Sequence, residues 1–150
     1  MLADAAAAET RSIVATADAI SELDGWIERV GMSWRVPTAV VFRARVCVAE
    51  IAANLLEHGR ARPEGDTLTV ELRQDGPGLA IELTDTGRAF DPTAWVPGTA
   101  APDGVSGRGL RLVRAYAAMS YRRAANQNIL RLRVVPAQPG AGAGSAGHPG

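Results

Sequence analysis

Residues 38–58 read TAVVFRARVCVAEIAANLLEH, and this stretch decides the fold. Its apolar side chains recur at steps of three and four, which is the spacing of one helix face. This apolar stripe consists of Val41, Ala44, Val48, Ile51 and Leu55. Pro37 or Thr38 can begin the helix, and Gly59 can end it as a C-cap. We therefore expect a long helix that runs to His58 and packs its apolar stripe on a core.

A polar ridge runs along the same helix. Glu50, Asn54 and His58 are spaced by four residues, so their side chains stack on one face, clear of the apolar stripe. Asn54 offers a neutral amide oxygen of the kind that Mg²⁺ accepts beside phosphates, and Glu50 can accept a proton from a hydroxyl or a water. The alternative is a solvated helix face, in which His58 only caps the negative end of the helix.

Two pairs of segments on the carboxyl side alternate apolar and polar side chains, which is typical of antiparallel hairpins. The first pair is 67–74 and 79–85, around Asp75-Gly76-Pro77-Gly78, and the second is 120–125 and 129–135, around residues 126–128.

Strand and helix patterns also lie before and between these hairpins. Residues 10–17 predict a strand, residues 18–30 predict a helix stopped by Gly31, and residues 110–119 resume helical spacing. This order of elements predicts an α+β fold, a two-layer α/β sandwich with helices on one face of a mixed, mostly antiparallel sheet.

Length and composition exclude several classes of protein. The 150 residues suit a single domain, and 16 basic against 16 acidic side chains give a formal charge of zero, which does not favour nucleic acid. Cys47 is the lone cysteine, so a disulfide and a structural zinc site are both disfavoured and a reducing cytoplasm fits. The alanine-rich amino terminus is interrupted by Asp4, Glu9 and Arg11, so we expect neither a signal peptide nor a membrane span.

We expect a loose amino terminus at 1–9, a domain at 10–135 and a disordered tail at 136–150. The tail holds five glycines, three prolines and four alanines, and it cannot bury enough surface to offset its ordering entropy.

A second motif follows the strand that ends at residue 84. Its sequence is Asp85-Thr86-Gly87-Arg88-Ala89-Phe90-Asp91. Asp85 can accept the exocyclic amino hydrogen of adenine, which the carbonyl of guanine cannot supply, and Gly87 leaves space for a flat ring against the backbone. Phe90 is expected to anchor the loop to the core. The alternative is an ordinary Asp-Thr-Gly turn.

A third motif follows a loop at 91–106, which contains three prolines and two glycines. We interpret this loop as a lid, and the alternative is a disordered insertion. It ends in Gly107-Arg108-Gly109-Leu110, where a helix begins. Backbone N–H groups at a helix start can face phosphate oxygens, and Arg108 or Arg111 can add contacts or stay solvated. The chain has no G-K-[ST] of a Walker loop and no strand followed by G-x-G-x-x-G.

AEIAANLLEHG at 49–59, DTGRAFDP at 85–92 and SGRGLRLVRAY at 106–116 together resemble the GHKL (Bergerat-fold) ATPases. Within them the chain is similar to the small anti-sigma factor serine kinases of the RsbW, SpoIIAB and BtrW type. The similarity covers roughly residues 10–135.

The resemblance implies a Bergerat fold with ATP and Mg²⁺ as cofactors. It implies Glu50 as catalytic base, Asn54 as metal ligand, Asp85, Gly87 and Phe90 around adenine, and Gly107, Arg108, Gly109 and Leu110 around the phosphates. Many relatives also reach adenine through a threonine on the last strand, whereas residues 128–131 contain none.

The function implied by the resemblance is an ATP-dependent serine/threonine protein kinase of a partner-switching system. Its substrate would be a STAS-domain anti-sigma factor antagonist, and related proteins also bind a sigma factor or form homodimers. Two alternatives remain open: a protein-binding module gated by nucleotide with little kinase activity, and an α/β interaction domain without nucleotide.

Overall fold

The structure of the chain is a computed structural model that describes residues 6–59, 61–94 and 107–137. Its elements, in chain order, are β1 (Ala8–Val14), α1 (Ala17–Ser33), α2 (Thr38–His58), β2 (Thr67–Asp75), β3 (Gly78–Asp85), the 3-10 helix η1 (Pro92–Ala94), α3 (Gly107–Tyr116), β4 (Ala118–Ala124) and β5 (Gln127–Val134).

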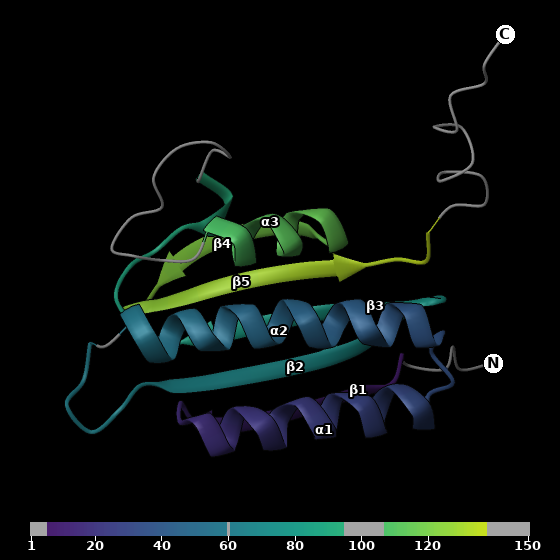
Figure 1. The fold of residues 1–150 in the computed structure, drawn as a ribbon, viewed down its shortest axis with the longest axis horizontal. Helices are drawn as coiled ribbons and strands as arrows, with labels where there is room; N and C mark the ends of the chain where they lie inside the picture. Colours follow the sequence, from purple (N-terminus) through teal and green to yellow (C-terminus); the bar gives the residue numbers. More distant parts are fainter. Residues whose placement is uncertain (1–5, 60, 95–106, 138–150) are drawn as a thin grey trace, which may run out of the picture.

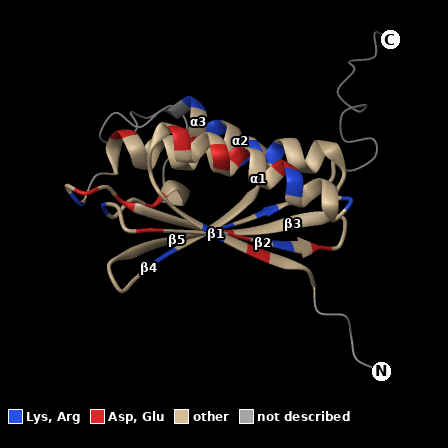
Figure 2. Ribbon diagram, turned by 90° about the horizontal axis from the view of Figure 1, so that it is seen from below, with Lys and Arg blue, Asp and Glu red and all other residues tan. Residues whose placement is uncertain are grey.

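The described strands form one sheet in the order β1-β2-β3-β5-β4. Every neighbouring pair is antiparallel, so the described strands lack the parallel pair that a mixed sheet would contain. The helices α1, α2 and α3 all lie on one face of this sheet, as Figures 1 and 2 show from two sides. The expected α+β fold with two layers is therefore confirmed.

The core lies between the sheet and α2. The predicted stripe on α2 is buried throughout, from Val41 to Leu55. Beneath it, alternate residues of neighbouring strands face the helices, for example Leu83 opposite Leu130 in the β3–β5 ladder. Since one face of α2 is fixed on the sheet, its polar ridge is held at one edge of the helix layer.

The first helix does not stop at Gly31, because α1 continues to Ser33. Gly31 instead lies where α1 and α2 pack, and a Cβ built on it would be 2.5 Å from Cγ2 of Val41. Its lack of a side chain allows the two helices to approach closely. Asp24 of α1 also forms an ion pair of 2.7 Å with Arg45 of α2.

Two further boundaries differ from the prediction. Helix α3 spans Gly107–Tyr116 rather than 110–119, so the predicted glycine motif forms its first turn. The last hairpin turns at Ala125 and Asn126, whose φ angles of 51° and 60° match a two-residue turn. Residues 127 and 128 therefore lie in β5 and not in the turn, which changes the interpretation of Asn128.

The ends of the chain are described only in part. Strand β1 begins at Ala8, two residues inside the segment expected to be loose. The tail from residue 138 and the predicted lid from residue 95 to 106 lie outside the described residues, and η1 occupies the start of that loop. None of the helices that the structure describes is both long and apolar enough to cross a membrane.

Candidate functional site

A cavity opens beside the carboxyl-terminal half of α2, at the end of β3 and the start of β5. It encloses about 670 Å³ of empty space, solvent at its mouth included. Its apolar lining consists of Ile51, Leu55, Ala89, Phe90, Pro92 and Leu130, and its other lining residues are Asn54, His58, Gly59, Asp85, Arg88, Tyr121 and Asn128. Apolar walls with a few converging polar groups are typical of sites for flat organic ligands.

Asp85 supplies the carboxylate of this cavity. Its Oδ1 accepts two hydrogen bonds of 2.9 Å, one from the backbone N–H of Gly87 and one from Nδ2 of Asn128. Burial raises the pKa of the Asp85 carboxyl above its ordinary value, although these two hydrogen bonds act in the opposite direction. Within the described residues Oδ2 accepts no hydrogen bond, so this oxygen is available to a donor on a ligand.

Gly87 fits a position where a side chain has no room. A Cβ built on it would lie 2.6 Å from the carbonyl oxygen of Gly59 and 2.6 Å from Cδ1 of Leu55. The N–H of Arg88 donates to the same Gly59 carbonyl at 3.0 Å. The loop that follows β3 therefore packs directly on the end of α2, and this contact closes one side of the cavity.

Asn128 is the site residue that the sequence interpretation missed. It is only 6% exposed and lies directly opposite Asp85 in the β3–β5 register. The alternation of Asn128, Leu130, Leu132 and Val134 would have placed its side chain on the buried face, had the strand been extended to residue 127. Asn128 thus places a buried amide with its own hydrogen bonds beside Asp85.

Glu50 lies at the amino end of α3. A Cβ built on Gly109 would collide with Oε2 of Glu50 and would be 3.0 Å from its Cδ. The glycine at this position therefore lets the Glu50 carboxylate approach the first turn of α3, where the backbone N–H groups carry the positive end of the helix dipole. Glu50 and the predicted phosphate motif, which are far apart in the sequence, are neighbours in the structure.

Asn54 lines the cavity one helical turn beyond Glu50. Among the described residues it has a buried amide nitrogen, Nδ2, without a hydrogen-bond partner. Such a donor costs free energy unless an acceptor outside the chain, for example a phosphate oxygen, satisfies it, whereas the amide oxygen Oδ1 is the atom that suits a cation. The described residues contain no cluster of three or more His, Cys, Asp or Glu side chains suited to a metal ion. A cation here would need phosphate oxygens and water as its other ligands, which fits Mg²⁺.

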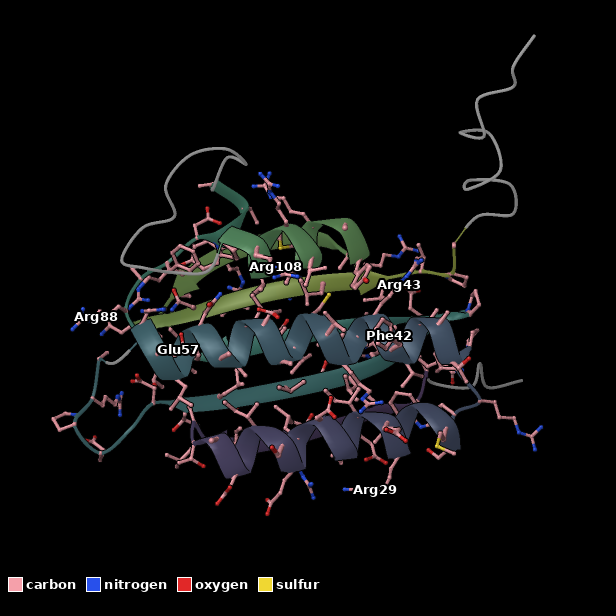
Figure 3. The ribbon with its side chains drawn as sticks, in the orientation of Figure 1. Arg29, Phe42, Arg43, Glu57, Arg88 and Arg108 are labelled. Carbon is pink, nitrogen blue, oxygen red and sulfur yellow. The ribbon has the colours of Figure 1, made fainter. Side chains whose placement is uncertain are left out.

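The other residues predicted for the site lie at the cavity, on the surface of α3 or in the core. Phe90 and His58 line the cavity, and Nε2 of His58 lies 3.3 Å from Oε2 of Glu57. Arg108 is exposed on the first turn of α3, whereas Leu110 is fully buried in the core. Figure 3 shows Arg88 near Glu57, at the carboxyl end of α2.

Comparisons with known proteins agree with this geometry. Residues 13–134 match the sequence family described as the histidine kinase-like ATPase domain. The chain is 27% identical over 129 residues to the serine/threonine-protein kinase BtrW of Bordetella bronchiseptica, a similarity that covers 83% of this chain and 91% of that protein.

Two solved structures are also similar. One is the histidine kinase domain of the blue-light activated histidine kinase of Erythrobacter litoralis EL346, with a TM-score of 0.48 and 20% identity over 65% of this chain and 45% of that one. The other is a further structure of that kinase, with a TM-score of 0.45 and 23% identity over 66% of this chain and 31% of that one. This chain thus spans less than half the length of either.

The family match covers most of the chain and includes all three motifs, the residues that line the cavity and the strands β2, β3, β4 and β5. The chain therefore belongs to the histidine kinase-like ATPase (GHKL) domain family, the members of which carry an ATPase fold.

Proposed function

We propose that this protein is an ATP- and Mg²⁺-dependent serine/threonine protein kinase that phosphorylates a STAS-domain anti-sigma factor antagonist. The observation that carries this proposal is the contact of Glu50 with the first turn of α3, which pairs a carboxylate base with a predicted phosphate site. The similarity to BtrW, named as a serine/threonine kinase, supports the same reaction.

The adenine end of the proposed site is the cavity. Asp85 accepts the exocyclic amino group through Oδ2, while Leu55, Phe90 and Leu130 contact the faces of the base. A buried carboxylate that accepts from an amino group rejects a carbonyl at the same position, because two acceptors would then face each other without a proton between them. The site therefore selects ATP over GTP.

The phosphate end lies toward Glu50 and α3. The first turn of α3 presents the positive end of the helix dipole to anionic oxygens, and Arg108 adds a cation at the same end. Asn54 would hold Mg²⁺, which when bound neutralises phosphate charge during transfer. Glu50 would accept the proton of the attacking serine or threonine hydroxyl.

The test is phosphoryl transfer from γ-labelled ATP to a panel of purified STAS-domain proteins, with the acceptor residue located by mass spectrometry. We expect labelling of a serine or threonine by the wild-type chain. Replacing Glu50 by Gln should lower the transfer rate by about 10² to 10⁴, the range of a positioned general base, while leaving affinity for an ATP analogue unchanged.

Glu57→Gln is the matched control, since Glu57 is an exposed carboxylate on the same helix. It should transfer phosphate at the wild-type rate. Transfer by Glu50→Gln at the wild-type rate would contradict the assignment of the base. Nucleotide binding without transfer by the wild-type chain would favour the nucleotide-gated binding module.

A further inference from the structure

We propose that Asn128 is a positioning residue that fixes the Asp85 carboxylate, so that one defined oxygen faces the base and sets the preference for a 6-amino purine. This inference rests on the proposed ATP site, but the role of Asn128 toward Asp85 can be measured without nucleotide.

The register of the sheet places the two side chains together. Asp85 ends β3 and is paired with Asn128, the second residue of β5. The next pair on the same face, Leu83 and Leu130, is buried beneath α2. Both polar side chains therefore point into the helix layer, where water is scarce and each polar group needs a partner.

The amide nitrogen of Asn128 is used completely. Nδ2 donates to Oδ1 of Asp85 at 2.9 Å and to the backbone carbonyl of Arg88 at 2.8 Å. A primary amide has two N–H donors, so both are engaged. One of them fixes the carboxylate, and the other fixes the loop that forms a wall of the cavity.

The amide oxygen of Asn128 is equally occupied. It accepts from the hydroxyl of Tyr121 at 2.6 Å, from Nη1 of Arg123 at 2.9 Å and from the N–H of Phe90 at 3.3 Å. These partners are all donors, whereas the partners of Nδ2 are all acceptors, which fixes the orientation of the amide. Asn128 has no donor or acceptor left for a ligand, so it acts on the base only through Asp85.

These hydrogen bonds give the two carboxylate oxygens of Asp85 different roles. Oδ1 is held by Asn128 and Gly87 from two sides, and Oδ2 is left for the ligand. Without Asn128 the carboxylate could rotate and present either oxygen, and it would lose a donor that favours its charged form. The charged groups that face Asp85 from other elements are Asp66, which opposes ionisation, and Arg123, which favours it.

The first experiment follows the side-chain carboxyl ¹³C signal of Asp85 against pH in the full chain without nucleotide. We expect Asn128→Ala to raise the pKa of Asp85 by about one to two units, the equivalent of one lost hydrogen bond to a charged group. Asn128→Asp is the isosteric variant that replaces only the donor, and it should raise this pKa further because two carboxylates would then be in contact. An unchanged Asp85 titration in both variants would overturn the inference.

Gln127→Ala is the matched control. Gln127 precedes Asn128 in the same strand, so its side chain points to the opposite face of the sheet. The control should leave the Asp85 titration at its wild-type position. A shift of the same size in this variant would show that any change in the hairpin moves the pKa, which contradicts a specific role of Asn128.

The second experiment measures affinity for non-hydrolysable analogues of ATP and of inosine triphosphate, which differ at the 6-position of the base. We expect the wild-type chain to prefer the ATP analogue by about 10- to 100-fold and Asn128→Ala to lose most of this preference. In an Asp85→Asn background the Asn128 substitution should add almost no further change in preference. An undiminished preference for the ATP analogue in Asn128→Ala would overturn the inference. A shifted Asp85 pKa in the Asn128 variants, together with no nucleotide binding by the wild-type chain, would refute the proposed function alone.

Discussion

Substitution of Gly109 by alanine displaces the proposed base without removing it. The new Cβ would occupy the place of the Glu50 carboxylate, so Glu50 has to adopt another rotamer. Only the end of a flexible side chain has to move, at a cost of about 0.5 to 1.5 kcal/mol. Alanine is favoured over glycine inside a helix by about 1 kcal/mol, and by less in a first turn. The two effects nearly cancel, so the free energy of unfolding should change by less than about 1 kcal/mol.

Activity should respond very differently from stability in this variant. If Glu50 has to lie against α3 to act as a base, phosphoryl transfer by Gly109→Ala should fall by about 10² or more, toward the loss expected for Glu50→Gln. The assay is transfer from labelled ATP at saturating nucleotide, together with denaturant unfolding and titration of an ATP analogue. Gly25→Ala is the control, since a Cβ there would meet only Nη1 of Arg29, at 3.2 Å, and should leave transfer unchanged.

Two results of the Gly109→Ala experiment would refute this reasoning. Transfer at the wild-type rate in the folded variant would show that the place of Glu50 beside α3 does not matter for the reaction. Loss of analogue binding in proportion to transfer would show that Gly109 serves the phosphates rather than the placement of Glu50.

Three further predictions concern the cavity and the core. Asp85→Asn should be as stable as the wild type or more stable at pH 7, because burial raises the pKa of Asp85 and its charged form opposes folding above that pKa. The same variant should bind an ATP analogue more weakly by roughly 1 to 3 kcal/mol. Lower stability by denaturant unfolding or unchanged calorimetric affinity would contradict this. Asn54→Ala should lose the Mg²⁺ dependence of analogue binding while keeping the metal-free affinity, and an intact Mg²⁺ effect in titrations would exclude Asn54 as a ligand. Burial raises the pKa of the Cys47 thiol from 9.0 to about 12, so the unfolded chain loses this proton at a lower pH than the folded chain. The free energy of unfolding should therefore fall as the pH rises above 9.0, and unfolding curves of Cys47→Ala should lack this decrease with pH.

The sequence predicted the fold well where its periodicity was long. The stripe on α2 and the alternation in β2 and β3 specify which face is buried, and both bury that face in the structure. The expectation that Gly31 ends the first helix is wrong, because a glycine in a helix can mark either a stop or a close packing contact. Only the position of Val41 on the neighbouring helix distinguishes the two.

Some parts of the site are formed by residues that lie far apart in the sequence, and local motifs could not identify these parts. Asn54 and Asp85 could be named from local motifs, and both line the cavity. The contact of Glu50 with Gly109 joins helices 59 positions apart in the chain, and no local pattern encodes it. Asn128 falls inside the expected turn because the end of that turn is placed two residues too late, at residue 128 instead of 126. Ala125 is an unusual residue at positive φ and carries no turn signal.

The most direct test of the account is calorimetric titration of the wild-type chain and of Asp85→Asn with non-hydrolysable ATP and GTP analogues, each with and without Mg²⁺. We expect binding of the ATP analogue that is strengthened by Mg²⁺, weak binding of the GTP analogue, and a clear loss of ATP-analogue affinity in Asp85→Asn. Equal binding of both nucleotides, or no binding at millimolar concentration, would contradict an adenine site at Asp85 and with it the proposed kinase.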